Sequence, residues 1–241
     1  MVANRKPLAL IDACLCGQRD FELVERNELV IAVCRCGVQH LDSTLTAAEY
    51  ESQYRGPYHR AVDRHPGCIP YRERYEHDRK VAARRWLRYG EVLGHALDDV
   101  RTALDVGCAN GAFVDYLRER GIRARGIDPD PAMARDGVET MLAGEVAGAF
   151  DLVTYHDVLE HVLDPAAEVL RASRLCYPGG LLVVDVPDVS VAAGFHHYKS
   201  EHPWYFTSDA LRNLLTRAGF ELRAVDRPVP GKIVLYGRRT G

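Results

Sequence analysis

The stretch that decides the fold is LDVGCANGAF, residues 104–113, in which an apolar run leads through an acid and two glycines into an amphipathic helical pattern. Gly107 and Gly111 permit positive φ angles and close backbone approach where a strand turns into a helix. Such a turn places a ligand at the carboxyl edge of the sheet, against the helix N-terminus. The sequence therefore predicts a ligand site at this turn.

A second acid, Asp128 in GIDPD, ends the next predicted strand about twenty residues later, where a carboxylate can hold the two hydroxyls of a ribose. The spacing D-x-G-x-x-x-G differs from the G-x-G-x-x-G of dinucleotide folds, which disfavours a bound pyrophosphate. Asp105 would repel a phosphate and favours a ligand with an ammonium or sulfonium group. The pattern favours a positively charged nucleoside that bears an amino acid; a purely structural turn is the alternative.

Residues 101–241 alternate short strand-like runs with helical patterns, in RTALDVG, GAFVDYLRERG, RARGIDP, DLVTYHD, HVLDPAAEVLRASRLC and GGLLVVDVP. This alternation predicts an α/β fold with a mostly parallel sheet. At the end, ELRAVDR and KIVLYGRR flank the turn PVPG, after a helix in SDALRNLLTRAGF. We therefore expect a terminal antiparallel hairpin that closes one edge. The third strand is weakly marked, and GVETML is its candidate.

Four motifs in this order, LDVGCANGAF, GIDPD, FDLVTYHDVLEHVLDP and PGGLLVVDVPD, resemble the class I S-adenosylmethionine-dependent methyltransferases over residues 101–241. The resemblance implies a Rossmann-like, mostly parallel, seven-stranded sheet and S-adenosylmethionine as the cofactor. It places the methionine end beside Asp105, Gly107 and Gly111 and the ribose beside Asp128, and it leaves Glu145 as the candidate adenine contact. The predicted cofactor-binding residues are Asp105, Gly107, Cys108, Asn110, Gly111, Asp128, Pro129, His156 and Asp157.

Methyl transfer from a sulfonium is an in-line displacement, so the protein has to align donor and acceptor and exclude water. A hydroxyl acceptor also benefits from a base, for which histidine is suited. His161 is the first candidate and His156 the second, since both follow the fourth predicted strand; a histidine that only bonds backbone at that junction is the alternative for His161. The loop FHHYKSEHPWYFT adds His197 as the third candidate catalytic residue, beside His196 and His202. Trp204, Tyr205 and Phe206 of the same loop either line an acceptor pocket or pack the loop onto the sheet.

A divalent cation is a further possibility at the segment after the fourth predicted strand. Asp157, Glu160 and His161 are spaced i, i+3, i+4, which places them on one face if that segment is a helical turn. Two carboxylates and an imidazole can hold a cation that binds a catechol-like acceptor. The spacing is similar to an E-x-x-E-H metal motif of ubiquinone-pathway O-methyltransferases, with Asp in place of the first Glu.

The N-terminal segment, residues 1–42, contains two C-x-C-G units that flank the strand-like FELVERNELVIAV. Cys14, Cys16, Cys34 and Cys36 supply four thiolates, enough to close a tetrahedral structural zinc site. The pattern resembles the N-terminal zinc ribbon of some bacterial methyltransferases that act on sugars and natural products. Those ribbons usually read C-x-x-C-G, so each unit here is one residue shorter. Four free cysteines in a small hairpin are the alternative.

Residues 43–100 are predicted to form a helical lid or linker with a helix over residues 71–89. The part from Arg55 to Gly90 holds ten Lys and Arg against four Asp and Glu, a net charge of +6. That charge favours either a solvated helical face or a surface for an anionic group. In the resembling ribbon proteins a Tyr-rich stretch reaches the cofactor, so Tyr54 and Tyr58 are candidates to contact its carboxylate.

The composition is that of an ordinary globular protein, with 241 residues, a net charge of −3 and 47% hydrophobic residues. Since no apolar run of about 18 residues occurs, we expect no membrane span, and the reduced-cysteine pattern favours a cytoplasmic protein. The leading hypothesis is an enzyme that O-methylates a small hydroxylated metabolite, such as a sugar, nucleotide sugar or natural product. C-methylation of a deoxysugar and an RNA-directed methyltransferase or nucleic-acid binder are the alternatives, and the overall charge disfavours nucleic acid as a partner. The sequence is silent on oligomeric state.

Overall fold

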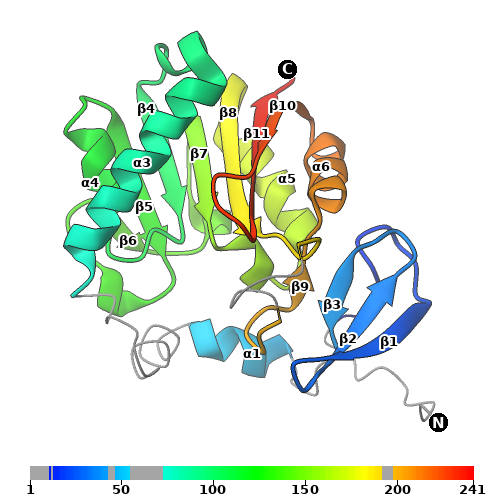
Figure 1. Cartoon of the computed structure of the whole chain (residues 1–241). Coiled ribbons are helices and arrows are strands. Elements are labelled where there is room, and N and C mark those ends of the chain that lie inside the picture. The colour runs from blue at the N-terminus through cyan, green and yellow to red at the C-terminus, as the bar shows by residue number, and fades with distance from the viewer. Residues whose placement is uncertain (1–10, 12, 43–46, 55–72, 192–197) are drawn as a thin grey trace.

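The computed structural model describes residues 11, 13–42, 47–54, 73–191 and 198–241, and its centre is a seven-stranded sheet in the order β10-β11-β8-β7-β4-β5-β6 (Figure 1). The strands from β6 to β8 are parallel, and β11 runs antiparallel between β8 and β10. This confirms the Rossmann-like, mostly parallel sheet with its terminal antiparallel hairpin. The strands are β4 (Thr102–Val106), β5 (Arg123–Asp128), β6 (Val138–Thr140), β7 (Phe150–His156), β8 (Cys176–Pro187), β10 (Phe220–Asp226) and β11 (Lys232–Arg239).

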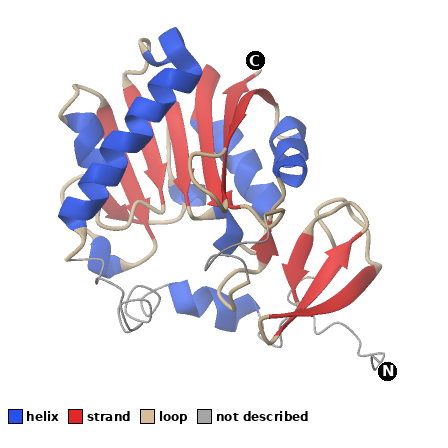
Figure 2. Cartoon of the chain, viewed as in Figure 1, coloured by secondary structure: helices blue, strands red, loops and turns tan. Residues whose placement is uncertain are grey.

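Helices cover both faces of this sheet, α3 (Tyr75–Leu93) and α4 (Ala112–Arg118) on one face and α5 (Pro165–Leu175) and α6 (Ser208–Arg217) on the other (Figure 2). The strand period of two divides each strand between the two cores. In β4, for example, Ala103 packs into the α3 and α4 side and Leu104 into the α5 and α6 side. Both faces of the central strands are therefore buried.

Helix α3 is longer at its end than the predicted helix over residues 71–89. It continues through Gly90 to Leu93 and ends at Gly94, whose φ is +54°. The prediction ended the helix too early, at Tyr89. Val92 and Leu93 pack against the core of the sheet, and this burial offsets the low helix propensity of Gly90. Residues 71 and 72 lie outside the described residues.

The helix predicted in HVLDPAAEVLRASRLC begins later than the first residue of that pattern, and the segment before it is not an α-helical turn. Asp157 has a φ of +55°, and a short 3-10 helix, η4 (Leu159–His161), follows it. Helix α5 begins only at Pro165, where the Asp164 side chain accepts a hydrogen bond from the Ala167 backbone N–H at 2.9 Å. Proline at the first helical position and aspartate as N-cap are strong helix-start signals, which explains the late start.

A second sheet combines the N-terminal segment with a strand from the main domain. Its order is β1 (Phe21–Arg26), β2 (Leu29–Cys34), β3 (Gln39–Leu41) and β9 (Trp204–Tyr205), all antiparallel. Strands β1 and β2 form the predicted hairpin, closed by Asn27 and Glu28, which both have positive φ as a type I′ turn requires. The contribution of β9 was not predicted.

Shorter elements complete the described chain. Helix α1 (Ala47–Tyr54) precedes α3 within the predicted lid region, and Figure 1 places it below the carboxyl ends of the parallel strands. Among the described residues no helix combines the length and the apolar character needed to cross a lipid bilayer. The remaining 3-10 helices are η1 (Gly94–Leu97), η2 (Pro131–Met133) and η3 (Ala143–Glu145).

Candidate active site

The Gly-rich turn between β4 and α4 has the backbone that the sequence analysis expected. The φ angles of Gly107 and Gly111 are +68° and +72°. A Cβ on Gly107 would lie 2.4 Å from Cγ2 of Val158, and one on Gly111 would lie 2.6 Å from Cγ2 of Val138. Both positions therefore require glycine for the backbone conformation and for the space around it.

Asp128 ends β5 beside this turn and ties the two together. Its Oδ2 accepts a hydrogen bond from the backbone N–H of Ala109 at 3.0 Å, and its Oδ1 accepts one from that of Asp130 at 2.9 Å. Ala109 itself has a φ of +47°. Asp128 therefore lies at the carboxyl edge of the sheet, against the Gly-rich turn.

Other predicted cofactor residues surround the same turn. Asn110 donates through Nδ2 to Asp78 of α3 at 2.8 Å, which joins the lid helix to the turn. Cys108 is buried, and burial raises the pKa of its thiol, so it is a neutral wall group. Pro129 follows Asp128 and is partly exposed. The carboxylate of Glu145 accepts from the backbone N–H of Leu142 at 2.6 Å and so caps η3.

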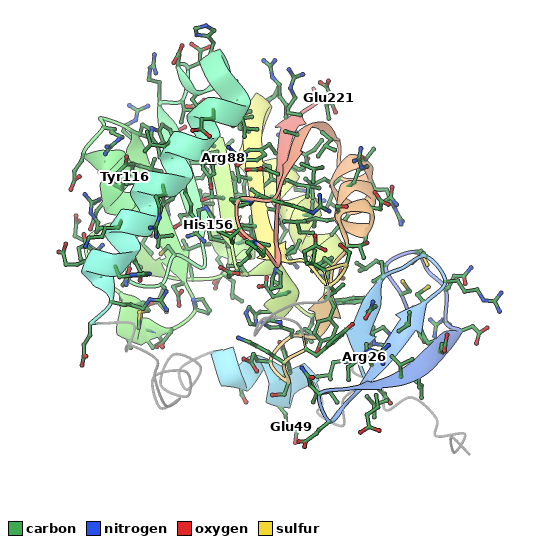
Figure 3. The ribbon with its side chains drawn as sticks, viewed as in Figure 1. Arg26, Glu49, Arg88, Tyr116, His156 and Glu221 are labelled. Atoms are coloured by element: carbon green, nitrogen blue, oxygen red, sulfur yellow. The ribbon has the colours of Figure 1, made fainter. Side chains whose placement is uncertain are left out.

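A buried polar chain joins Asp105 to α3 through His156, which is labelled in Figure 3. His156 Nδ1 lies 3.1 Å from Asp105 Oδ1, and its Nε2 lies 2.6 Å from the Tyr89 hydroxyl. Thr154 donates to the same Asp105 oxygen at 2.7 Å. Burial lowers the pKa of His156, so the ring is neutral; it donates from Nδ1 and accepts from Tyr89. Both ring nitrogens are engaged, which leaves His156 unsuited as the base for an acceptor.

Asp157, directly after β7, belongs to a group of ion pairs. Its carboxylate contacts the Lys232 ammonium and lies 3.6 Å from Nη2 of Arg85. The same two cations contact Asp185 of β8, Arg85 at 3.1 Å and Lys232 at 3.3 Å. These partners come from α3 and β11, far away in the sequence. Asp157 is therefore not part of the cation site that was predicted for it with Glu160 and His161. That prediction required a helical turn, and the positive φ of Asp157 is incompatible with one.

Glu160 and His161 instead meet His202, and one ligand atom from each lies within 4.8 Å of the others. His161 Nδ1 lies 3.0 Å from the carbonyl oxygen of Glu201, so this nitrogen carries the proton and donates it, and in the neutral ring the lone pair is on Nε2. The His161 and His202 rings pack edge to face, with centroids 4.6 Å apart. Burial raises the pKa of Glu160 to about 8, and Glu160 Oε2 has no hydrogen-bond partner in the described part of the chain.

Trp204, Tyr205 and Phe206 are all buried, so the structure answers the question left open for them in favour of packing. Trp204 Nε1 donates to the carbonyl of Leu163 at 3.0 Å, and the Tyr205 hydroxyl donates to that of Lys199 at 2.9 Å. His197, Tyr58 and the side chain of Tyr54 lie outside the described residues.

The two C-x-C-G units adopt the same conformation and bring their sulfurs together. Cys14 Sγ lies 3.4 Å from Cys36 Sγ, and Cys16 Sγ lies 3.6 Å from Cys34 Sγ. In both units the glycine has a φ of +87°. Four thiolates at about 2.3 Å from a zinc ion are separated by about 3.8 Å. The shortened units therefore still fit a tetrahedral ion.

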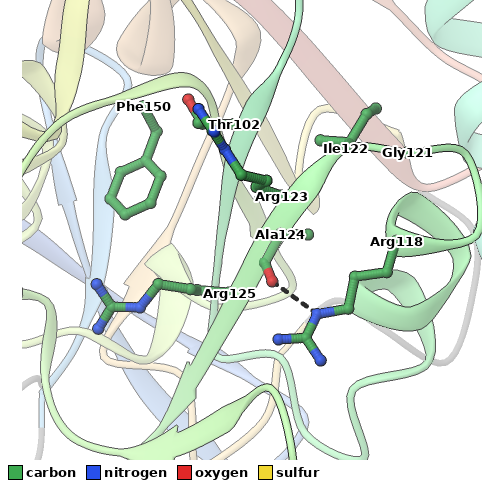
Figure 4. A pocket seen from close by; sticks show the side chains of 8 residues that line it. All are labelled: Thr102, Arg118, Gly121, Ile122, Arg123, Ala124, Arg125 and Phe150. Carbon is green, nitrogen blue, oxygen red and sulfur yellow. Dashed lines mark hydrogen bonds between the residues drawn. The ribbon is translucent and has the colours of Figure 1, made fainter.

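A pocket of about 540 Å³ opens at the opposite, amino edge of the parallel strands (Figure 4). Thr102, Arg123 and Phe150, the first residues of β4, β5 and β7, line it. Arg118 also lines it and donates to the carbonyl of Ala124 at 2.9 Å. It lies at the other end of the strands from the Gly-rich turn, so it is not part of the candidate site.

Several groups of the site escaped the sequence analysis. Tyr89, Arg85 and Lys232 carry no local motif, and each reaches the site from an element far away in the chain. His202 was noticed only as one histidine of its loop. A usable signal was the repeat of tyrosine and arginine along α3 at helical spacing, which places Tyr89 and Arg85 on one face.

Comparison with known proteins agrees with this geometry. A profile described as "Methyltransferase domain" matches residues 75–225. The chain is 37% identical over 112 residues to a ubiquinone biosynthesis O-methyltransferase of Paracidovorax citrulli, a match that covers 39% of this chain and 47% of that protein. The corresponding Pseudomonas paraeruginosa protein is 38% identical over 96 residues, covering 33% and 41%. This chain spans about half the length of these curated relatives.

Solved structures show the same fold at low sequence identity. The 1,6-didemethyltoxoflavin N1-methyltransferase of Burkholderia thailandensis superposes with a TM-score of 0.59 at 21% identity, covering 91% of this chain and all of that one. The magnesium protoporphyrin IX methyltransferase of Synechocystis PCC 6803 gives a TM-score of 0.55 at 14% identity, covering 78% and 97%. Both were solved with S-adenosylhomocysteine bound.

Proposed function

The chain belongs to the methyltransferase domain family, and from that premise we propose that it is an S-adenosylmethionine-dependent enzyme that methylates an oxygen of a small hydroxylated metabolite, such as a sugar, a nucleotide sugar or a natural product. The observation that carries this proposal is that Glu160, His161 and His202 lie together close to the Gly-rich turn. Glu160 and His161 belong to η4, which directly follows Val158, and Val158 packs against Gly107 of that turn. The O-methyltransferase names of the sequence relatives favour oxygen over carbon or nitrogen as the acceptor atom.

In this proposal the methyl donor, S-adenosylmethionine, binds at the Gly-rich turn. Its methionine end lies beside Asp105, Gly107 and Gly111, and Asp128 accepts from the ribose hydroxyls. The close packing at both glycines and the position of Asp128 against the turn support this placement. The buried chain through His156 and Tyr89 fixes the position of the Asp105 carboxylate.

On the acceptor side, His161 takes the proton of the attacking hydroxyl at Nε2 as the oxygen–methyl bond forms and the sulfonium–methyl bond breaks. The leaving thioether is neutral, so no acid is needed at the sulfur. The Glu201 carbonyl holds the His161 proton on Nδ1 and so fixes the required tautomer. His202 and the protonated Glu160 beside it supply further polar groups that can orient the acceptor.

A divalent cation fits the same three side chains. One buried Glu160 oxygen lacks a hydrogen-bond partner among the described residues, and with the two imidazoles it forms a donor set of the kind that binds zinc or iron rather than magnesium. Glu160, His161 and His202 would hold such an ion, without Asp157. His161 would bind it through Nε2, so the ion would replace His161 as the activating group and polarise the acceptor oxygen as a Lewis acid.

Zinc at Cys14, Cys16, Cys34 and Cys36 completes the proposal. The sulfur separations and the two matching glycine turns support it. Four protein ligands leave no open position, so this ion has a structural role. Elemental mass spectrometry of the purified protein tests it, with about one zinc per chain expected from this site.

The acceptor proposal is tested by incubating the protein with a metabolite extract and methyl-deuterated S-adenosylmethionine. We expect a small product that gains one labelled methyl on oxygen, identified by mass spectrometry and the carbon shift of the methyl group. Labelled RNA, or a methyl on carbon, would overturn it. With the acceptor in hand, His161→Ala should lower kcat without weakening donor binding, and His95→Ala, a fully exposed histidine, should change neither.

A further inference from the structure

Strand β9 comes from the main domain but pairs in the N-terminal sheet, beside β3. From this pairing we infer that the two C-x-C-G units position the acceptor side of the active site, by holding β3 and, through β3, the segment that carries His202. The inference rests on the proposed function, because it takes His202 as an acceptor-side group and the cysteines as ligands of a metal ion. It concerns the positioning of residues, and it assigns no chemical step to the metal.

The first link runs from the cysteines to β3. Cys34 ends β2 and Cys36 lies two residues further, three residues before β3 starts at Gln39. The Cys34 backbone N–H donates to the carbonyl of Val38 at 2.9 Å, and the Gly37 N–H donates to that of Cys34 at 2.9 Å. These bonds connect the turn that carries Cys36 to the residue just before β3.

The second link runs from β3 to β9. Gln39 pairs with Tyr205 and His40 pairs with Trp204 in antiparallel register. The Leu41 N–H donates to the carbonyl of Pro203 at 2.9 Å. Pro203 directly follows His202, so the backbone beside His202 is hydrogen-bonded to the N-terminal segment.

Side chains reinforce this second link. His40 is buried between Phe21 of β1 and Trp204, with ring centroids 4.6 Å and 5.6 Å away. Trp204 also donates to Leu163, which lies two residues after η4. One indole thus joins the N-terminal segment to the segment that carries Glu160 and His161.

The lid region adds a third support at the same place. The Tyr50 hydroxyl of α1 donates to the carbonyl of Glu201 at 2.5 Å, and this carbonyl also accepts the proton of His161 Nδ1. The residue before His202 therefore orients His161 while α1 and β3 hold its surroundings. The acceptor side therefore depends on β3, β9 and α1, which lie outside the Rossmann-like sheet.

The donor side is held by different elements. Ala109 is tied to Asp128 of β5, and Asn110 is tied to Asp78 of α3. These contacts lie within the main sheet and its covering helix. If the two C-x-C-G units lose their arrangement, the segment that carries His202 should become less ordered, while the affinity for S-adenosylmethionine is retained.

The chain contains two tryptophans, Trp86 in α3 and Trp204 in β9, which makes the inference directly measurable. The full-length Trp86→Phe protein has Trp204 as its sole tryptophan. A chelator under reducing conditions removes the metal, elemental mass spectrometry follows its loss, and zinc is then added back. Trp204 emission reports on β9, and calorimetry with S-adenosylmethionine reports on the donor side.

We expect metal loss to shift Trp204 emission to longer wavelength, reversibly on adding zinc, while the Kd for S-adenosylmethionine stays within about threefold of its starting value. Unchanged Trp204 emission after complete metal loss would overturn the inference. A loss of cofactor affinity in parallel with the metal would also overturn it, because the ion would then support the whole fold. A metal-free purified protein with native emission would instead refute the zinc proposal itself and leave cofactor binding and the methyltransferase assignment intact.

A second variant tests the link without touching the cysteines. His40→Ala removes the ring between Phe21 and Trp204, so it should shift Trp204 emission while the metal content stays complete. Val30→Ala, at an exposed position of the same sheet, is the matched control and should leave both unchanged. A native Trp204 spectrum in His40→Ala would show that β9 does not depend on the N-terminal segment.

Discussion

The hydroxyl of Tyr89 lies 2.6 Å from Nε2 of His156, and this contact joins helix α3 to the carboxyl edge of the sheet. Both side chains are buried, and the other nitrogen of His156 is bonded to Asp105. The contact therefore links the N-terminal half of the chain to the acid that precedes the Gly-rich turn.

Tyr89→Phe should lower the free energy of unfolding by about 1–3 kcal/mol, because it leaves the buried Nε2 of His156 without its donor. Tyr177→Phe, at an exposed tyrosine, should stay within about 0.5 kcal/mol of the wild type. Urea unfolding of the three proteins checks this, and equal midpoints for both variants would contradict it.

Gly107→Ala should destabilise the protein by about 1–3 kcal/mol more than Gly121→Ala. Both glycines have positive φ, so both variants carry the strain of a left-handed residue. The added methyl group would clash with Val158 at position 107, whereas no atom lies within 4 Å of it at position 121. Thermal or urea unfolding measures the difference. We also expect Gly107→Ala alone to weaken cofactor binding, and equal costs for the two variants would refute the close packing of the turn.

The stability of the metal-free protein should carry a pH dependence from Glu160. Its folded pKa is about 8 against an ordinary value of 4.5, so between these values the folded state keeps a proton that the unfolded state has lost. The contribution of Glu160 to stability therefore falls as pH rises through this interval, by up to about 1.4 kcal/mol per pH unit.

Glu160→Gln has no such proton to lose, so its free energy of unfolding relative to the wild type should rise from pH 5 to pH 8. Urea unfolding at the two pH values, in the presence of a chelator, measures this double difference. A difference between the two proteins that does not change with pH would show that the carboxyl of Glu160 titrates normally.

The parts of the site that were predictable are those encoded by neighbouring residues. Gly107 and Gly111 could be placed in the turn because a strand-to-helix turn with positive φ leaves a local signature, and Asp128 could be placed beside it because it ends the next strand at a regular distance. The hairpin of β10 and β11 was predictable for the same reason, since its two strands flank a short turn.

The parts that were not predictable depend on contacts between distant segments. Nothing near Trp204 marks it as the partner of His40, because a two-residue strand has no periodicity and its pairing is decided by the folded sheet. Asp157 failed as a predicted metal ligand for a related reason. The spacing rule holds only inside a helix, and one positive φ removed this residue from it.

The most direct test of the account is calorimetric titration of S-adenosylmethionine into the wild type, Asp128→Ala and Asp151→Ala. Asp151 is the matched control, since its carboxylate also accepts backbone hydrogen bonds, from Arg101 and Thr102, but at the amino edge of the sheet. We predict that the wild type and Asp151→Ala bind the cofactor with similar Kd and that Asp128→Ala loses binding while remaining folded by circular dichroism. An unchanged Kd for Asp128→Ala would contradict the placement of the donor at the Gly-rich turn.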